Sequence, residues 1–269
     1  MSTPLRLLAV FAHPDDETLG TGGTLARYGA EGVETYLVTA TRGERGWSGP
    51  EEESPGLEAM GQLRERELRA AAEALRLREV SFLDYVDGEL DQADAPEVIG
   101  KIVSHVRRIR PQVVITFGPD GGYGHTDHIA ISQLATSAVV CAADATYRDP
   151  SGGEPYRVAK LYYKVWTREE QELYARLFGQ IVMTFDGVER TGVPWEPWQI
   201  TTRVDARDYW RTTWEAVSCH RSQLPMYDRL RALPEETHRR LWGDQGYYRA
   251  YSAVNGGRLL ETDLFAGLR

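Results

Sequence analysis

Short apolar runs alternate with longer amphipathic stretches along the first half of the chain. Mostly apolar runs of this length, bounded by turn residues, are typical of buried strands. We therefore predict strands at residues 5–12, 33–41, 80–85 and 113–117, and a further strand at 158–166.

Two helical patterns separate the predicted strands. Residues 57–77 carry an apolar stripe that includes Leu68 and Leu75, and residues 96–110 carry another until Pro111 ends it. Strands that alternate with helices build a parallel sheet with helices packed against it. The pattern predicts an α/β fold of the Rossmann-like kind, with three layers, α/β/α, and a mainly parallel sheet.

A proline- and glycine-rich segment, residues 147–155, separates this region from the rest of the chain. We expect residues 1–150 to form the Rossmann-like catalytic region. Residues 151–269 are expected to form a smaller α+β extension that completes the substrate pocket within one integrated domain. In this extension, Thr167 and Glu170 have the spacing of a capping box and predict a helix start.

Two features of the sequence leave their role open. Residues 43–56, with Trp47 and three consecutive glutamates, are too long for a simple connection, so we expect a loop over the carboxyl end of the preceding strand. It either borders the site or is a solvated loop without a role. Late tryptophans such as Trp195 and Trp198 could stack on sugar rings, or instead close a core or an oligomer interface.

Length and charge narrow the class of protein. A chain of 269 residues with 42% apolar residues can bury a substantial core. The formal charge of −9, without a basic block, argues against nucleic acid and membrane as partners and favours a neutral or cationic small molecule. Because there is no signal-peptide pattern and no apolar stretch of about eighteen residues, we expect a soluble, cytoplasmic protein. Cys141 and Cys219 are expected to be buried within helical stretches and to stay reduced.

Two polar clusters follow two of the predicted strands. The first comes directly after residues 5–12 and the second closely follows residues 113–117. Since the carboxyl ends of neighbouring strands share one crevice in such sheets, imidazoles and carboxylates from both clusters can meet there, and these donors suit zinc. The clusters are His13-Pro14-Asp15-Asp16-Glu17-Thr18 and Tyr123-Gly124-His125-Thr126-Asp127-His128.

Each cluster alone has a simpler interpretation. Proline followed by acidic residues is ordinary first-turn helix chemistry, and a His-x-x-His pair can face solvent or only pack. A nucleotide-binding site is a further alternative, because Gly20-Thr21-Gly22-Gly23 looks like part of a dinucleotide fingerprint. That segment lacks the required glycine spacing and follows acidic residues that would repel a pyrophosphate. We therefore favour the metal site.

The two clusters resemble the motifs of the zinc-dependent N-acetylglucosaminyl deacetylases. This family includes the glycosylphosphatidylinositol-precursor deacetylase, the mycothiol-pathway deacetylase and amidase, and the bacillithiol-pathway deacetylase. The resemblance covers at least residues 5–130. Further matches are Thr41-Arg42-Gly43-Glu44-Arg45-Gly46, the pair Arg64 and Glu67, Asp87-Gly88, and His220-Arg221-Ser222-Gln223.

The resemblance implies a division of labour at the metal. The family's metal ligands match His13, Asp16 and His128, and three protein ligands leave at least one position for water, as in a catalytic zinc site. Asp15 is then the expected general base, which takes a proton from the attacking water and later passes it to the leaving amine. The alternative role for Asp15 is that of a helix cap.

The remaining catalytic groups also follow from the resemblance. His125 is expected to stabilise the tetrahedral oxyanion as an imidazolium, and Asp127 to hold its ring and raise its pKa. Tyr123, in a glycine-rich loop, is expected to swing towards the oxyanion when substrate binds. Its alternative is packing in the wall of the site.

Four residues are expected to bind substrate. Arg64 and Asp87 match family positions that contact the glycoside, although both could instead form a surface salt bridge. Glu44 belongs to a matching motif, and His220 is expected to supply a further ring nitrogen. We expect the other two histidines to be solvated; they are His105 and His238.

These features predict a zinc-dependent hydrolase that removes the N-acetyl group from a small N-acetylglucosamine derivative and releases acetate. Fe2+ is the other candidate metal in the cell. One alternative is an amidase that cleaves a larger acyl group from a glucosamine-linked thiol conjugate. Another is an inactive sugar-binding module, which an unligated Asp15 disfavours. The aglycone and a homo-oligomeric state stay open.

Overall fold

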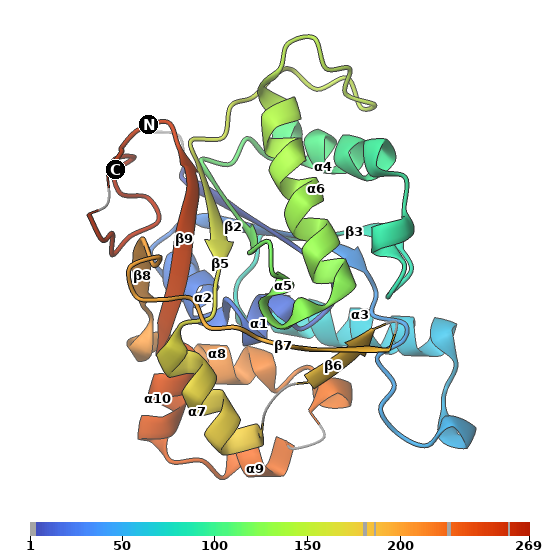
Figure 1. Cartoon of the computed structure of the whole chain (residues 1–269). Helices are drawn as coiled ribbons and strands as arrows, with labels where there is room; N and C mark the ends of the chain where they lie inside the picture. The colour runs from blue at the N-terminus through green and yellow to red at the C-terminus, as the bar shows by residue number, and fades with distance from the viewer. Residues whose placement is uncertain (1–3, 180–181, 186, 225–226, 258) are drawn as a thin grey trace.

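A mixed sheet with the strand order β3-β2-β1-β4-β5-β9-β8 runs through the centre of the computed structural model (Figure 1). The structure describes residues 4–179, 182–185, 187–224, 227–257 and 259–269. The strands of this sheet are β1 (Arg6–Phe11), β2 (Glu34–Thr41), β3 (Glu79–Tyr85), β4 (Val113–Phe117), β5 (Lys160–Lys164), β8 (Thr202–Asp205) and β9 (Asp244–Ser252). A separate hairpin pairs β6 (Val182–Phe185) with β7 (Val188–Thr191).

The strands from β3 to β5 in this order are parallel, which confirms the predicted sheet. β1 pairs with β2 on one side and with β4 on the other, so that Ala9 lies between Leu37 and Ile115. The chain thus builds outwards from β1 to β3 and then returns to the opposite side of β1 at β4. Open α/β sheets bind ligands beyond the carboxyl ends of the strands at such a reversal. The reversal lies between β1 and β4, the strands that the two polar clusters follow.

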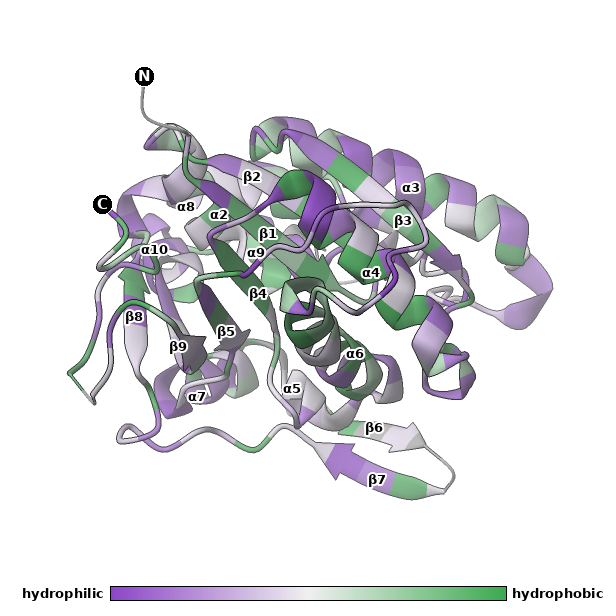
Figure 2. Cartoon of the chain, turned by 90° about the horizontal axis from the view of Figure 1, so that it is seen from above, coloured by the Kyte–Doolittle hydropathy of each residue, from purple (hydrophilic) through white to green (hydrophobic). Residues whose placement is uncertain are grey.

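Helices cover both faces of the sheet and complete the three layers (Figures 1 and 2). α4 (Ala95–Ile109) and α6 (Thr126–Ala143) pack on one face, and α2 (Gly22–Ala30), α3 (Leu57–Ala74) and α8 (Trp210–Val217) pack on the other. The other helices are α1 (Asp16–Leu19), α5 (Gly121–Gly124), α7 (Arg168–Phe178), α9 (Tyr227–Arg231) and α10 (Glu235–Gly243).

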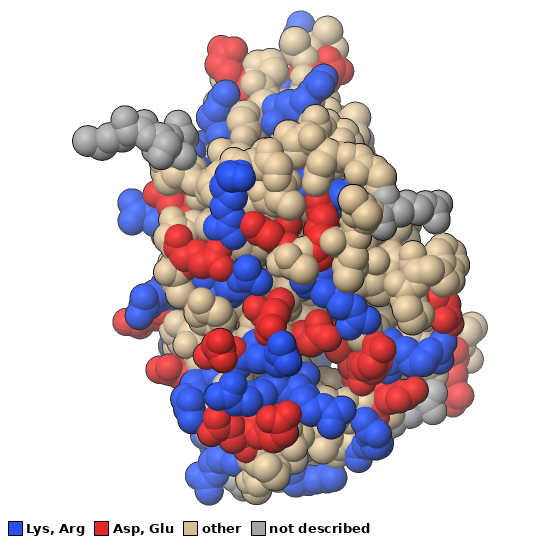
Figure 3. Space-filling model, turned by 90° about the vertical axis from the view of Figure 1, so that its left-hand side faces the viewer, with Lys and Arg blue, Asp and Glu red and all other residues tan. Residues whose placement is uncertain are grey.

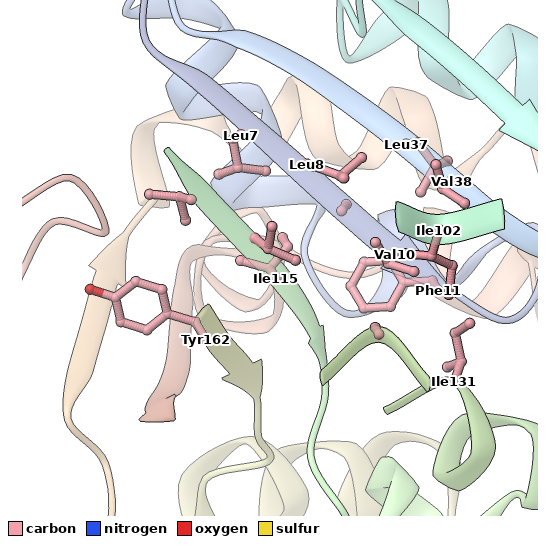
Figure 4. Packing of buried hydrophobic residues seen from close by; sticks show 14 of the residues in the cluster. Leu7, Leu8, Val10, Phe11, Leu37, Val38, Ile102, Ile115, Ile131 and Tyr162 are labelled. Carbon is pink, nitrogen blue, oxygen red and sulfur yellow. The ribbon is translucent and has the colours of Figure 1, made fainter. Parts of the chain in front are cut away.

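The core lies around β1 because that strand is buried on both faces. Its residues from Leu7 to Phe11 are at most 1% exposed, and Phe11 contacts Phe117 of β4 with ring centroids 4.9 Å apart. Figure 4 shows Ile102 of α4 and Ile131 of α6 beside this strand. Burial on both faces explains why the strand has a continuous apolar run without alternation.

The C-terminal half extends the same sheet in the antiparallel direction. β9 pairs with β5 and β8 pairs with β9. The predicted capping box is confirmed at the start of α7, where Thr167 and Glu170 bond each other's backbone N–H groups. The predicted division at about residue 150 therefore does not interrupt the sheet. That the two parts have different functions stays a prediction.

A buried carboxylate ties the C-terminal segment to this sheet. Glu261 Oε1 lies 2.8 Å from Lys160 Nζ and 2.8 Å from Arg249 Nη1, and its Oε2 accepts a 2.6 Å hydrogen bond from the Tyr162 hydroxyl. Burial would raise the pKa of Glu261, but these donors outweigh it and lower the pKa to about 2. The carboxylate is therefore ionised in the folded protein at neutral pH.

We expect Glu261→Gln to destabilise the fold by about 3–5 kcal/mol, because the substitution leaves the buried Lys160 ammonium without its counter-ion. The folded-state pKa lies below the ordinary value, so this contribution is present above about pH 4.3 and is lost as the pH falls towards 2. Urea unfolding at pH 7 and pH 3 measures both effects. Glu235→Gln breaks an exposed pair with Arg211 and should cost about 0–1 kcal/mol. Equal losses in both variants would contradict the prediction.

Two expectations about single residues are wrong. His238 is 3% exposed instead of solvated, because the rings of Trp210 and Trp214 cover it and Trp242 Nε1–H donates to its Nδ1. These tryptophans thus close a second core. The cysteines are half-buried instead of buried, and both are free thiols, as expected.

The surface carries charges of both signs. On the face shown in Figure 3, Lys and Arg side chains lie among Asp and Glu side chains. In the part of the chain that the structure describes, no helix is both long enough and apolar enough to cross a membrane.

Candidate metal centre and active site

The fold brings the two polar clusters together at the reversal between β1 and β4. His13 lies two residues after β1, and Asp16 begins α1. His128 lies in the first turn of α6, which follows β4 after the short helix α5. The prediction that the clusters share one site is thereby confirmed.

Ligand-capable atoms of three side chains lie close together at this point. His13 Nδ1 lies 3.1 Å from His128 Nε2, which lies 3.3 Å from Asp16 Oδ1, and His13 Nδ1 lies 3.8 Å from Asp16 Oδ2. Ligands at 2.0–2.1 Å from a tetrahedral ion are about 3.3 Å apart. All three side chains are less than 9% exposed. The His13–His128 and His128–Asp16 distances therefore fit a small divalent cation, while His13 approaches Asp16 at its other carboxylate oxygen, Oδ2.

The opposite nitrogens of both imidazoles are held by acceptors. His13 Nε2 lies 2.9 Å from Asp87 Oδ1 and 3.1 Å from Asp127 Oδ2, and His128 Nδ1 lies 3.2 Å from the Gly121 carbonyl oxygen. Each acceptor requires a proton on the nitrogen that it faces, which leaves the other nitrogen with a lone pair for the metal. Asp87 was predicted to bind sugar and Asp127 to orient His125. Both carboxylates instead contact the ring of His13, a candidate metal ligand.

Asp16 uses one carboxylate oxygen for the fold and keeps the other for the site. Its Oδ2 accepts hydrogen bonds from the backbone N–H groups of Ala12 and His13, at 3.1 and 2.8 Å. Its Oδ1 faces His128. Burial raises the pKa of Asp16 to about 7, although the charge of His13 opposes the shift.

The carboxylates around His13 favour a proton on its ring. Burial alone would lower the pKa of His13, but hydrogen bonds to Asp127 and Asp87 outweigh it and raise the pKa to about 10. His13 in turn helps to lower the pKa of Asp87 to about 2, against the effect of burial. Because a ligand nitrogen must be deprotonated, metal uptake has to displace this proton.

Other donor sets share these residues. Among the described residues, His13 lies close enough to share an ion with His125 and His128, and also with Asp87 and Asp127. The second set would use a nitrogen of His13 that the carboxylates need protonated. Metal retention in His128→Ala and His125→Ala separates these sets.

Asp15 stands beside the ligands in a strained backbone conformation. Its φ of 109° and ψ of −26° lie in the left-handed region, where residues with a β-carbon are uncommon. Its side chain makes no hydrogen bond that caps α1, so the helix-cap alternative is not supported. Arg64 Nη2 lies 3.2 Å from Asp15 Oδ2, and burial raises the pKa of Asp15. A carboxylate in this place is free to accept a proton.

The surroundings of His125 disfavour the expected imidazolium. Burial and the positive charge of His13 lower its pKa to about 4, while Asp127 and Asp87 oppose the shift, as expected for a carboxylate near an imidazole. The Asp127 backbone N–H donates to His125 Nδ1 at 3.2 Å, whereas its carboxylate accepts from the backbone N–H groups of Gly88 and Leu90. The first turn of α6 therefore aims this carboxylate at His13. A neutral His125 can still donate an N–H.

The glycine-rich loop before α6 holds Tyr123 over the site. Gly121, Gly122 and Gly124 all have positive φ, and a β-carbon on Gly121 would lie within 3.0 Å of α6 atoms. The Tyr123 ring packs edge-on against His128, with centroids 5.1 Å apart. Burial and nearby carboxylates raise the pKa of the phenol, which thus stays protonated and can donate.

The predicted sugar ligands Arg64, Asp87 and Glu44 lie in one cluster next to the metal site. Arg64 is 3% exposed and Asp87 is 7% exposed, so the surface salt bridge is excluded. Arg64 donates to the carbonyl oxygens of Gly43 and Pro14, at 2.9 and 2.5 Å, and a carboxylate oxygen of Glu44 accepts from the Asp87 N–H. The start of the 43–56 loop thus borders the site, which agrees with the first of its two predicted roles.

Sequence reasoning missed several contacts between the two halves of the chain. His220 is 1% exposed, and its Nε2 lies 2.7 Å from Glu17 Oε1. Ser222 binds Glu67 of α3 through its N–H and hydroxyl, at 2.9 and 2.6 Å, and Gln223 donates to the Gly46 carbonyl. Glu17 was visible in the first motif, but only the structure shows that it is fully buried.

We expect Asp127→Asn to weaken metal binding by about 10–100-fold, because the carboxylate no longer holds the His13 ring for the metal. Competition with a chelator measures the affinity. Asp94→Asn, at the exposed start of α4, is the control and should leave the affinity unchanged. If Asp127→Asn keeps the full affinity and loses only rate, the carboxylate serves His125 instead, as the sequence suggested.

Known proteins resemble this chain in sequence and in fold. The family model described as PIG-L, GlcNAc-PI de-N-acetylase, matches residues 8–139. A 1D-myo-inositol 2-acetamido-2-deoxy-alpha-D-glucopyranoside deacetylase from Thermobispora bispora is 33% identical over 98% of both chains. A conserved protein from Thermus thermophilus is 29% identical, covers 94% of this chain and 97% of its own, and has a TM-score of 0.66.

A more distant structure shares the fold. The N,N'-diacetylchitobiose deacetylase from Pyrococcus horikoshii is 21% identical, with a TM-score of 0.68 over 91% of this chain and 83% of its own. The Thermobispora bispora relative spans 98% of this chain, and the residues that the family model matches include both polar clusters. The chain belongs to the PIG-L family of de-N-acetylases.

Proposed function

We propose that this protein is a zinc-dependent hydrolase that removes the N-acetyl group from an N-acetylglucosamine derivative and releases acetate. One observation carries the proposal: the buried ligand atoms of His13, Asp16 and His128 converge, while the Asp15 carboxylate beside them takes no part in that set. Two imidazoles and one carboxylate suit zinc, and three ligands leave room for reactants.

The chain's own residues supply the proton transfers. When bound, a divalent cation polarises the acetamide carbonyl and lowers the pKa of water. Asp15 accepts a proton from the attacking water and returns it to the nitrogen of the leaving amino sugar. His125 and Tyr123 donate hydrogen bonds to the oxygen on which negative charge develops. Arg64 holds the Asp15 carboxylate in place for both transfers.

The relatives support an amino sugar as substrate. The Thermobispora bispora protein is named for deacetylation of a 2-acetamido-2-deoxy-glucopyranoside of myo-inositol. We extend the sugar class to this chain and leave the aglycone open. Asp87, Glu44 and Arg64 are the polar groups beside the site that we propose for contact with sugar hydroxyls.

A second candidate is hydrolysis of a larger acyl group. It is favoured by a cavity of about 220 Å³ lined by Tyr123, Trp166, Gln171 and Tyr174. Tyr123 belongs to both the cavity and the metal site, and the rings of Trp166 and Tyr174 lie 5.1 Å apart. An aromatic cavity of this kind could hold either a long acyl chain or an apolar aglycone.

A matched substrate panel separates the two candidates. The protein, loaded with Zn2+, is assayed for amine release from glucosamine derivatives that share one aglycone and carry acetyl, butanoyl or cysteinyl groups on nitrogen. The proposal expects the highest kcat/KM for the acetyl compound. A preference of ten-fold or more for a larger acyl group would favour the second candidate, and no amine release from any compound would contradict both.

A further inference from the structure

The backbone of Asp15 needs support because its left-handed conformation is strained for a residue with a β-carbon. Its carbonyl oxygen accepts from the N–H and hydroxyl of Thr18 and from the N–H of Leu19, at 3.0, 2.9 and 2.9 Å. These bonds belong to the start of α1. They hold the carbonyl side of the residue and leave the N–H side to another partner.

That partner is the side chain of Glu17. Its Oε2 accepts the Asp15 N–H at 3.0 Å, across a turn of only two residues. Its Oε1 lies 2.7 Å from His220 Nε2, which comes from the far end of the sequence. Glu17 is 0% exposed and His220 is 1% exposed, so neither group is open to solvent. One carboxylate thus bridges a buried imidazole and the N–H of the proposed base.

His220 acts through only one of its two ring nitrogens. Its Nδ1 is buried and has no hydrogen-bond partner among the described residues. Its backbone is fixed by a 3.1 Å bond from its N–H to the Val217 carbonyl at the end of α8. The ring therefore contacts Glu17 through Nε2 and has almost no edge exposed to a ligand.

We infer that Glu17 and His220 form a positioning pair that sets the direction of the Asp15 carboxylate. His220 fixes the Glu17 carboxylate, and Glu17 fixes the strained Asp15 N–H. From the other side, Arg64 binds the Pro14 carbonyl and the Asp15 carboxylate. The inference rests on the proposed function, because the base must point at the reacting water. It replaces sugar contact as the role of His220.

The neighbouring Ser222 offers a matched control. It anchors the same segment to the first half of the chain, but through Glu67 of α3, which makes none of these contacts with Asp15. Ser222→Ala removes the 2.6 Å hydroxyl bond to Glu67 and the 3.0 Å bond that the hydroxyl accepts from the Gln223 amide, and it keeps the backbone bond to Glu67. A role that is only structural would affect both anchors alike, whereas a positioning role is specific to His220.

The test compares substitutions that keep or remove the donor at Nε2. A glutamine amide can reach the place of Nε2, whereas asparagine reaches only that of Nδ1 and leucine offers no donor. We expect His220→Gln to retain kcat within about three-fold, and His220→Asn and His220→Leu to lose about 10–100-fold, the scale of a misplaced reacting group. KM and metal content per chain should stay near those of the native protein in all three.

Several results would overturn the inference. These are equal losses of kcat in His220→Gln and His220→Leu, an equal loss in Ser222→Ala, or a raised KM with unchanged kcat, which would indicate sugar contact. If His220→Leu does not fold, the comparison of His220→Asn with His220→Gln still tests whether the donor at Nε2 is needed. Crystal structures give a readout without activity: Asp15 should leave its φ of 109° in His220→Asn and keep it in His220→Gln. If the native protein is inactive but the Asp15 φ changes in His220→Asn and not in His220→Gln, only the proposed function is contradicted.

Discussion

Asp15→Asn is expected to keep about one metal ion per chain and to lose about 10²–10⁴-fold in kcat. The retained metal follows from the geometry, since the Asp15 carboxylate contacts Arg64 and lies outside the converging set of His13, Asp16 and His128. The lost rate follows because an amide cannot take a proton from water. Asparagine also tolerates the left-handed backbone that this position requires.

The matched variant is His128→Ala, which removes a ligand that is 1% exposed and whose Nδ1 is held by the Gly121 carbonyl. It should lose both metal and activity. Metal content after gel filtration and kcat on an N-acetylglucosamine derivative are measured together for both variants. Equal metal loss in both would make Asp15 a ligand, and full metal retention in His128→Ala would point to another donor set.

His125→Ala is expected to cost about 100-fold or more in kcat, the usual scale for the loss of an oxyanion donor. The ring stacks beside the candidate ligand His128 with centroids 4.9 Å apart, so it would lie near a carbonyl polarised by a bound metal. Burial and the charge of His13 lower its pKa to about 4, so we expect the ring to donate as neutral imidazole. Metal content should not change.

The pH dependence separates neutral from charged His125. Because burial raises the pKa of Asp15, the fraction of ionised base falls as the pH drops through a value above the ordinary 3.9 or so, and the rate falls with it. His125→Ala should lower the whole profile and leave any basic limb in place. Disappearance of the basic limb in this variant would show that a protonated His125 is needed, as the family resemblance implied.

Sequence patterns predict the half of the fold that surrounds the metal centre, for a physical reason. The strands β1 and β4 are buried on both faces, so their apolar runs are continuous and their ends are marked by polar motifs. Two motifs at adjacent carboxyl ends must then lie close together. The shared site of His13 and His128 needed no knowledge of long-range packing.

The contacts behind that site could not be predicted, because they depend on how later elements pack. His220 lies 203 positions from Glu17 in the sequence, and no periodicity relates them. The aim of the Asp127 carboxylate depends on the rotation of the first turn of α6, and proximity in sequence suggested His125 instead. His238 lies on a polar helix, where only the three tryptophans around it in space explain its burial.

Metal-dependent release of acetate tests the central claim most directly. The protein is stripped with a chelator, divided, and reloaded with Zn2+ or left metal-free, and acetate and free amine are measured from the same N-acetylglucosaminyl-inositol sample. The proposed function predicts equal amounts of acetate and amine from the reloaded protein, and turnover below a hundredth of that rate from the metal-free protein. Equal rates with and without metal, or amine without acetate, would contradict it.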